Sequence, residues 1–175
     1  MITDCIIAHI PVIESCVLPK EQLSRLNKEH KELLQSIRAE PLGTERIRAF
    51  DMSMNILGDS LGLQGDNRVS IKDFNLPHIL IHNHADSAPI SPGDFTSFIR
   101  RPNTLSIQAV GHDGSVSILE RLPDYDAAGA IHKFIDILET ISAALSSGAG
   151  SSDISFIVDK FLKSLSENGF TYRRW

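Results

Sequence analysis

A stretch of seven residues near the middle of the chain, 78–84 (HILIHNH), constrains the fold most. Its aliphatic residues stand at consecutive positions, so both faces of a strand formed from them are apolar. Such a strand needs cover on both faces, and helices provide that cover in α/β proteins. The stretch therefore predicts the central strand of a sheet with helices on both sides.

Helical patterns before and after this strand supply the covering elements. The aliphatic residues of one segment recur at helical spacing and predict a helix over about 20–38: Leu23, Leu26, Leu33, Leu34 and Ile37. Ser91 and Pro92 predict the N-cap and the first residue of a short helix. Two more helices are expected in YDAAGAIHKFIDILETISAAL and SDISFIVDKFLKSLSENG, with Gly169 ending the second.

Alternating apolar residues predict the remaining strands. One begins at about Glu45, and short strands are expected at 55–58 and 68–71, with turns at 58–59 and 65–67. The runs TLSIQAV and SVSILERL, joined by GHDG, predict a β-hairpin, whereas CIIAHIPVI fits either a strand or a docking segment. The order of elements indicates one α/β (or α+β) domain with a central mixed sheet, an N-terminal helix and a C-terminal helical pair.

Length and charge limit the class of protein. With 175 residues, 42% of them hydrophobic, the chain can form one domain with a buried core. The formal net charge of −5 argues against nucleic-acid binding, because neutralising phosphates requires a basic face. Cys5 and Cys16 lack CxxC spacing and are expected to be buried thiols in a reducing compartment. No apolar run suits a membrane helix and no basic signal-peptide region is present, so a cytoplasmic protein is expected; secretion without such a signal stays open.

Polar residues at the end of the central strand suggest a metal site. His82 and His84 stand two residues apart, so on a strand both side chains project from the same face. Asp94 follows in the first turn of the predicted short helix. Two imidazoles and one carboxylate leave one open position on tetrahedral Zn²⁺, as in catalytic zinc sites. Glu45 is then a candidate general base, and Ser91 a candidate donor to an oxyanion.

Each of these residues also has a purely structural interpretation. Ser91 and Asp94 fit the Ser-x-x-Asp capping box, which satisfies free N–H groups at a helix start. The two histidines can be ordinary residues at a strand end, and Glu45 can be a solvent-exposed strand residue. Asp86 is an alternative ligand that follows the histidines closely, and Glu40 is an alternative base at a helix end. Asp86 is the weaker candidate beside Asp94, and Glu40 is the weaker candidate beside Glu45.

Taken together, the residues resemble the pattern of the JAMM (JAB/MPN) metalloprotease family. That pattern is a Glu on an upstream strand, then His-x-His-Pro, then a loop ending in Ser-x-x-Asp. In this chain TERIRAFD contains the Glu, HNH contains the two histidines, and SPGD contains the Ser and the Asp. The similarity covers about residues 43–122 and looks closest to compact JAB-like domains of bacteria and phages, including the RadC-related branch.

The resemblance implies a fold and a set of roles. The fold would be the cytidine-deaminase-like JAB/MPN fold over 43–122, with an N-terminal helical extension (1–42) and C-terminal helices (123–175) in one domain. It also implies Zn²⁺ as the cofactor. The implied roles are zinc ligands for His82, His84 and Asp94, acid/base for Glu45 and oxyanion donor for Ser91.

The implied activity is hydrolysis of a peptide or isopeptide bond in a protein or peptide substrate, which is ubiquitin-like for some family members. Two alternatives are a non-catalytic JAB-like interaction module and a RadC-like protein of DNA metabolism. Ala85 stands where the family has Pro, and the loop before Asp94 is about one residue shorter than in the eukaryotic deubiquitinase branch. The substrate therefore does not carry over. The aliphatic stripes of the C-terminal helices indicate core, with a homodimer face as the alternative.

Overall fold

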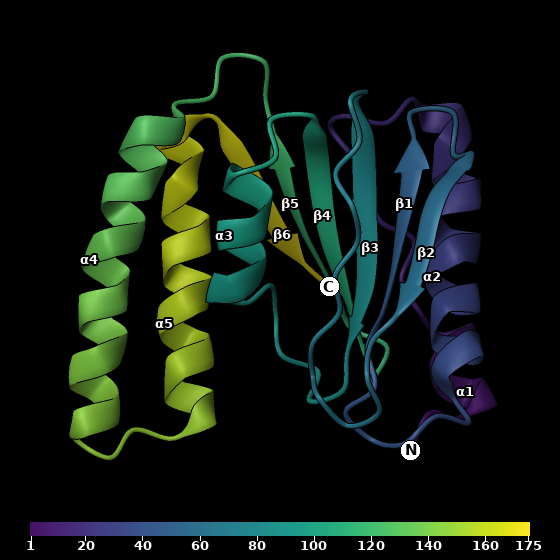
Figure 1. Cartoon of the computed structure of the whole chain (residues 1–175), viewed down its shortest axis with the longest axis horizontal. Coiled ribbons are helices and arrows are strands. Elements are labelled where there is room, and N and C mark those ends of the chain that lie inside the picture. The colour runs from purple at the N-terminus through teal and green to yellow at the C-terminus, as the bar shows by residue number, and fades with distance from the viewer.

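The structure, a computed structural model, describes all residues 1–175 around one six-stranded sheet (Figure 1). Its strands are β1 (Arg46–Asp51), β2 (Ile56–Leu61), β3 (His78–His84), β4 (Thr104–Gly111), β5 (Val116–Arg121) and β6 (Phe170–Arg174). They lie in the order β2-β1-β3-β4-β5-β6. Because β3 and β4 run parallel and all other neighbours run antiparallel, the sheet is mixed.

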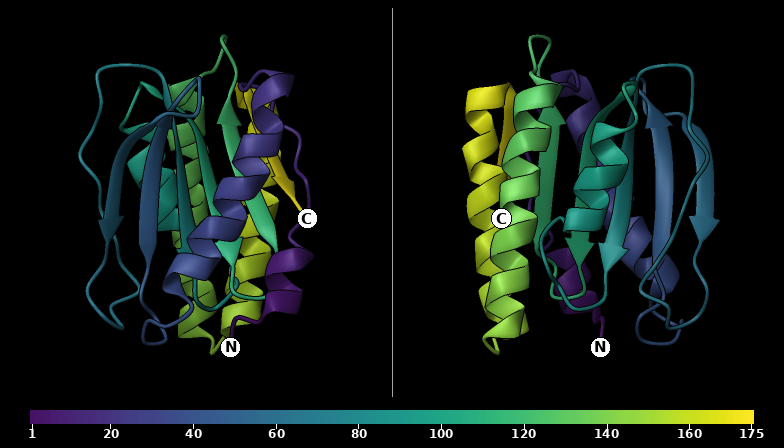
Figure 2. Two further views of the ribbon diagram at one scale, coloured as in Figure 1. Left: turned by 90° about the vertical axis from the view of Figure 1, so that its right-hand side faces the viewer. Right: turned by 60° about the vertical axis from the view of Figure 1, so that its left-hand side comes forward.

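Helices cover both faces of this sheet (Figures 1 and 2). They are α1 (Asp4–Ala8), η1 (Lys20–Gln22), α2 (Leu23–Ile37), α3 (Pro92–Ile99), α4 (Ala127–Ser146), α5 (Ser151–Ser164) and η2 (Leu165–Asn168). Helix α2 packs on one face, and α3 and α5 pack on the other, with α4 beside α5. The mixed α/β fold predicted from the sequence is therefore present. None of the helices combines the length and the apolar character that crossing a bilayer requires.

Strand β3 lies in the interior of the sheet, and all of its residues are buried. Ile79 and Ile81 belong to the core beneath α2, whereas Leu80 belongs to the core beneath α3 and α5. Burying an aliphatic side chain of this size contributes about 1.5–3 kcal/mol. The apolar run is thus explained by cover on both faces, and the alternation places His82 and His84 on the same face as Leu80.

Several boundaries differ from the predictions, since a strand needs a neighbour as well as a pattern. Residues 62–77 contain no strand, so the strand expected at 68–71 is wrong. Val69 and Ile71 instead pack their side chains against the core without joining the sheet. The turn expected at 58–59 is also wrong, because β2 continues through it as the partner of β1.

The two ends of the chain differ as well. The C-terminal FTYRR (170–174) forms β6, which pairs with β5, and Phe170 is buried in the core beneath α5. At the N-terminus, the open question of CIIAHIPVI is answered by the short helix α1. Cys5 and Cys16 are exposed, not buried as expected. The reason for Cys5 is that α1 is too short to bury any of its residues.

A buried histidine of α2 is expected to make stability sensitive to acid. Burial lowers the pKa of His30 to about 4, and its Nε2 donates to Gln108 Oε1 at 2.7 Å. The unfolded ring has an ordinary pKa of 6.5, so acid protonates the unfolded chain first. Burial of the neutral His30 ring therefore adds about 3 kcal/mol to the free energy of unfolding at neutral pH relative to acid. This stabilisation is complete above pH 6.5 and is lost as the pH falls towards 4.

Urea unfolding at pH 7 and pH 4.5 checks this expectation. His30→Gln is expected to lose less stability between the two pH values than the wild-type protein loses. His132→Gln, at an exposed position of α4, serves as the control and is expected to behave like the wild type. Equal acid sensitivity in all three proteins would contradict the assignment.

Candidate metal centre

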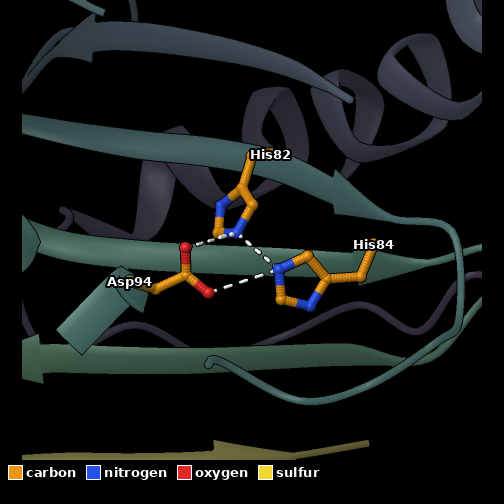
Figure 3. A group of neighbouring side chains, drawn as sticks. All are labelled: His82, His84 and Asp94. Carbon is orange, nitrogen blue, oxygen red and sulfur yellow. Dashed lines mark hydrogen bonds and ion pairs between the residues drawn. The ribbon is translucent and has the colours of Figure 1, made fainter. Parts of the chain in front are cut away.

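The end of β3 and the start of α3 bring three side chains together (Figure 3). His82 and His84 project from the same face of β3, and Asp94 reaches them from the first turn of α3. His82 Nε2 lies 3.2 Å from Asp94 Oδ1, His84 Nε2 lies 3.2 Å from Asp94 Oδ2, and the two Nε2 atoms are 2.9 Å apart. These are the three residues that the sequence predicted as metal ligands.

The capping box of α3 holds Asp94 in this place. Ser91 Oγ accepts the Asp94 N–H at 3.1 Å, and Asp94 Oδ2 accepts from both the Ser91 N–H and the Ser91 hydroxyl at 2.7 Å. The structural interpretation of this pair is therefore confirmed, and it is compatible with a metal-binding role for Asp94. The hydroxyl hydrogen of Ser91 is directed to Asp94, so the oxyanion role of Ser91 stays a prediction.

The loop after β3 orients the second histidine. His84 Nδ1 donates to the Ala88 carbonyl at 2.9 Å, which directs the Nε2 lone pair of the neutral ring towards Asp94. Asp86, the alternative ligand, accepts the Ala88 N–H at 3.0 Å and is not part of the cluster. The carboxylate of Asp86 therefore stabilises the turn of the loop after β3. His82 has no such orienting partner, because its buried Nδ1 makes no hydrogen bond.

The donor atoms fit a small divalent cation. Ligand atoms around tetrahedral zinc, each about 2.0–2.1 Å from the ion, are about 3.3 Å apart. The three observed separations of 2.9, 3.2 and 3.2 Å are close to this value. Two neutral imidazoles and a carboxylate suit Zn²⁺ and other first-row divalent ions. The cluster is therefore a candidate metal centre whose donor set does not by itself select the metal.

Without a metal, the three groups form a buried ion pair. Burial favours the neutral ring of His84, but the hydrogen bond and the charge of Asp94, together with the Ala88 hydrogen bond and the charge of Glu45, raise the pKa of His84 to about 9. Burial acts against the charge of Asp94 too, yet both histidines together hold its pKa well below the usual range. Metal binding must displace the imidazolium proton, so binding competes with protonation.

Glu45 stands immediately before β1 and lines the same groove as the three ligands. Its residue is only 8% exposed, so it is not the solvent-exposed strand residue of the structural interpretation. Burial raises the pKa of Glu45, although the charges of the two histidines oppose the rise. A carboxylate with a raised pKa is better suited to take up and return a proton. Glu40, the alternative base, does not line the groove.

The groove beside the cluster has a volume of about 930 Å³ and an apolar floor. Ile47, Leu80 and Ile107 of the sheet form this floor. The first turns of α3 line one side, and β2 with the segment after it lines the other. A groove of this size next to the candidate ligands provides room for a substrate chain.

The sequence interpretation passed over Asn83, which stands between the two histidines and is fully buried. The available signal was a single amide within a strand predicted to be covered on both faces. His112 lies in the turn between β4 and β5, and its Nε2 is 3.2 Å from the Asn83 amide nitrogen. Asn83 is therefore the residue of this region whose role the sequence left unexplained.

No protein-family model, curated protein or solved structure matches the chain. What the fold and the site define is a mixed α/β protein with a His-His-Asp group that could bind a metal at the end of a central strand.

Proposed function

We propose that the chain is a zinc-dependent metallopeptidase or isopeptidase of the JAMM (JAB/MPN) type, acting on a peptide or protein in the cytoplasm. The observation that carries the proposal is the convergence of His82, His84 and Asp94 beside a buried Glu45 in one groove. The resemblance in sequence over 43–122 supports it. A mixed sheet with helices on both faces is compatible with the cytidine-deaminase-like fold of that family.

The chemistry divides between the ion and the side chains. A zinc ion bound by the two histidines and Asp94 would polarise the scissile carbonyl and lower the pKa of a water molecule. Glu45 accepts a proton from the attacking water and returns it to the leaving amine, a role that suits its raised pKa. Ser91 holds Asp94, and rotation of its hydroxyl away from Asp94 would let it donate to the oxyanion.

The groove also limits the kind of substrate. Its volume of about 930 Å³ and the aliphatic side chains of Ile47, Leu80 and Ile107 that line it leave room for a segment of a peptide or protein substrate. A ubiquitin-like protein tail is one such segment, and the family resemblance is the reason to include it in the assay.

A second candidate function is a non-catalytic JAB-like interaction module. One observation favours it: four large aliphatic side chains of α4 are exposed along one stripe, namely Ile131, Ile135, Leu138 and Leu145. Such a stripe is suited to a partner helix or to a second copy of the chain. The module would bind metal without hydrolysing a peptide, so metal binding and hydrolysis must be measured separately.

The decisive experiment measures metal content and hydrolysis in matched histidine variants. Purified wild-type protein is expected to bind one zinc ion per chain, and His82→Ala/His84→Ala is expected to bind none. His9→Ala/His132→Ala removes two exposed histidines outside the cluster and is expected to retain the ion. Cleavage of a fluorogenic peptide and of an isopeptide-linked fusion is expected only in the proteins that retain zinc.

Two outcomes would contradict the proposal in different ways. Absence of bound metal in the wild type, even after zinc is added, would show that the three residues are not a metal centre. Metal bound at His82 and His84 without hydrolysis of either kind of substrate would favour the interaction module.

A further inference from the structure

Asn83 stands between the two candidate metal ligands in the chain but faces the opposite side of the sheet. Side chains alternate along β3, so His82 and His84 face the groove, while Asn83 lies on the side of Ile81 and α2. It is fully buried. A buried amide needs partners for its oxygen and for both of its hydrogens, and this one has all of them.

Two of these partners are main-chain groups on either side of Glu45. Asn83 Oδ1 accepts the Arg46 N–H at 2.7 Å, and Asn83 Nδ2 donates to the Thr44 carbonyl at 3.0 Å. The antiparallel pairing of β1 with β3 ends at Ile47 and His82. The Asn83 side chain therefore continues the connection beyond the last paired residues, where Glu45 stands.

The other edge of the same segment is held by Gly62, the residue that follows β2. The Glu45 carbonyl accepts the Gly62 N–H at 2.8 Å. Gly62 is closely packed, since a Cβ atom there would lie 2.2 Å from the Arg68 carbonyl oxygen. The backbone of Glu45 is thus held from both sides, by a side chain on the β3 edge and by a main-chain amide on the β2 edge.

A third contact sets the orientation of the amide. Asn83 Nδ2 lies 3.2 Å from His112 Nε2, which can accept its second hydrogen. The His112 N–H donates to the His84 carbonyl at 3.2 Å. The contacts of Asn83 therefore join the backbone around Glu45 to the backbone of a metal ligand through the hairpin between β4 and β5.

We propose that Asn83 is a positioning residue: it holds the strand end that carries Glu45 in register with the strand that carries the two histidines. The inference rests on the proposed function, because only that function makes Glu45 a general base whose position matters. Asn is suited to the place because its short side chain offers one acceptor and two donors. Alanine offers neither, and an ionised aspartate offers only acceptors.

The test uses Asn83→Ala, Asn83→Asp and, as a matched control, Asn103→Ala, which removes an amide bonded to the Phe74 carbonyl away from the groove. We expect Asn83→Ala to lower kcat by about 10- to 100-fold, because small misplacement of a catalytic group is costly. KM and zinc affinity should change by less than about threefold, since the ligands and the groove remain. The control should leave kcat unchanged.

Amide hydrogen exchange of the metal-free protein gives a readout that does not depend on activity. The Arg46 amide should exchange at least about tenfold faster in Asn83→Ala than in wild type, because it loses its acceptor. In Asn83→Asp the acceptor remains, so the Arg46 amide should stay protected while kcat falls through loss of the bond to Thr44.

In Asn83→Ala, unchanged exchange at Arg46 or a kcat within twofold of wild type would overturn the inference. So would a loss of zinc affinity as large as the loss of kcat, because that would indicate general damage to the site. If Asn83→Ala does not fold, Asn83→Asp decides. A kcat of Asn83→Asp within twofold of wild type, or an Arg46 amide that loses its protection, would overturn the inference. A wild-type protein without zinc or hydrolysis would remove the proposed function, and Arg46 exchange alone would then decide whether Asn83 holds the strand end.

Discussion

Replacement of Glu45 by glutamine is expected to lower hydrolysis by about 10²- to 10⁴-fold and to leave zinc binding unchanged. Glutamine keeps the size and the buried position of the side chain but cannot take up the proton of the attacking water. Glu45 is not among the three clustered donors, so its loss removes no ligand. The expected result is a protein that binds metal and has almost no turnover.

Zinc content and single-turnover cleavage of the same peptide substrate check this expectation. Glu40→Gln is the control, because Glu40 is the alternative base and lies outside the groove. Turnover that survives Glu45→Gln would overturn the general-base assignment. Turnover that disappears only in Glu40→Gln would transfer the role to Glu40.

Replacement of Asp94 by asparagine is expected to change the charge of the metal-free cluster and to weaken zinc binding. Burial favours the neutral ring of His84, and the hydrogen bond and charge of Asp94 are the largest of the causes that together raise its pKa to about 9. Without them, burial is opposed only by the Ala88 hydrogen bond and the charge of Glu45, so the pKa of His84 should fall well below 9. Loss of a ligand should weaken zinc binding by more than about 100-fold, the upper end of the effect for residues that only support ligands.

An NMR titration of the His84 ring in the metal-free protein measures the first effect, and competition with a chelator measures the second. Asp86→Asn is the matched control, since Asp86 lines the same groove but uses its carboxylate for the Ala88 turn. The control should keep both the high pKa of His84 and the zinc affinity. A His84 pKa that stays near 9 in Asp94→Asn would contradict the ion pair.

Features that depend on neighbouring residues were predictable from the sequence. The consecutive aliphatic residues of 78–84 predicted a strand covered on both faces, and β3 is such a strand. The Ser91 and Asp94 capping box needs only four consecutive residues, and it is present. The hairpin of β4 and β5 and the two C-terminal helices follow for the same reason, because turn chemistry and helical periodicity are local.

Features that depend on distant partners were not predictable in this way. The pattern of 68–71 alternates like a strand, but those residues have no neighbouring strand and remain outside the sheet. The C-terminal FTYRR becomes β6 because β5 offers it a free edge. The amide of Asn83 looks unremarkable in sequence, since its partners around Glu45 come from a different strand.

For the candidate site, the sequence by itself determined that His82 and His84 share one face of a buried strand and that Asp94 begins the next helix. The period of a strand and the capping of a helix are sufficient reasons. Only the tertiary structure decided that α3 returns Asp94 to the histidines and that Glu45 is buried in the same groove. The physical reason is that pairing of β1 with β3, completed by Asn83, joins segments far apart in the chain, and no local pattern encodes that contact.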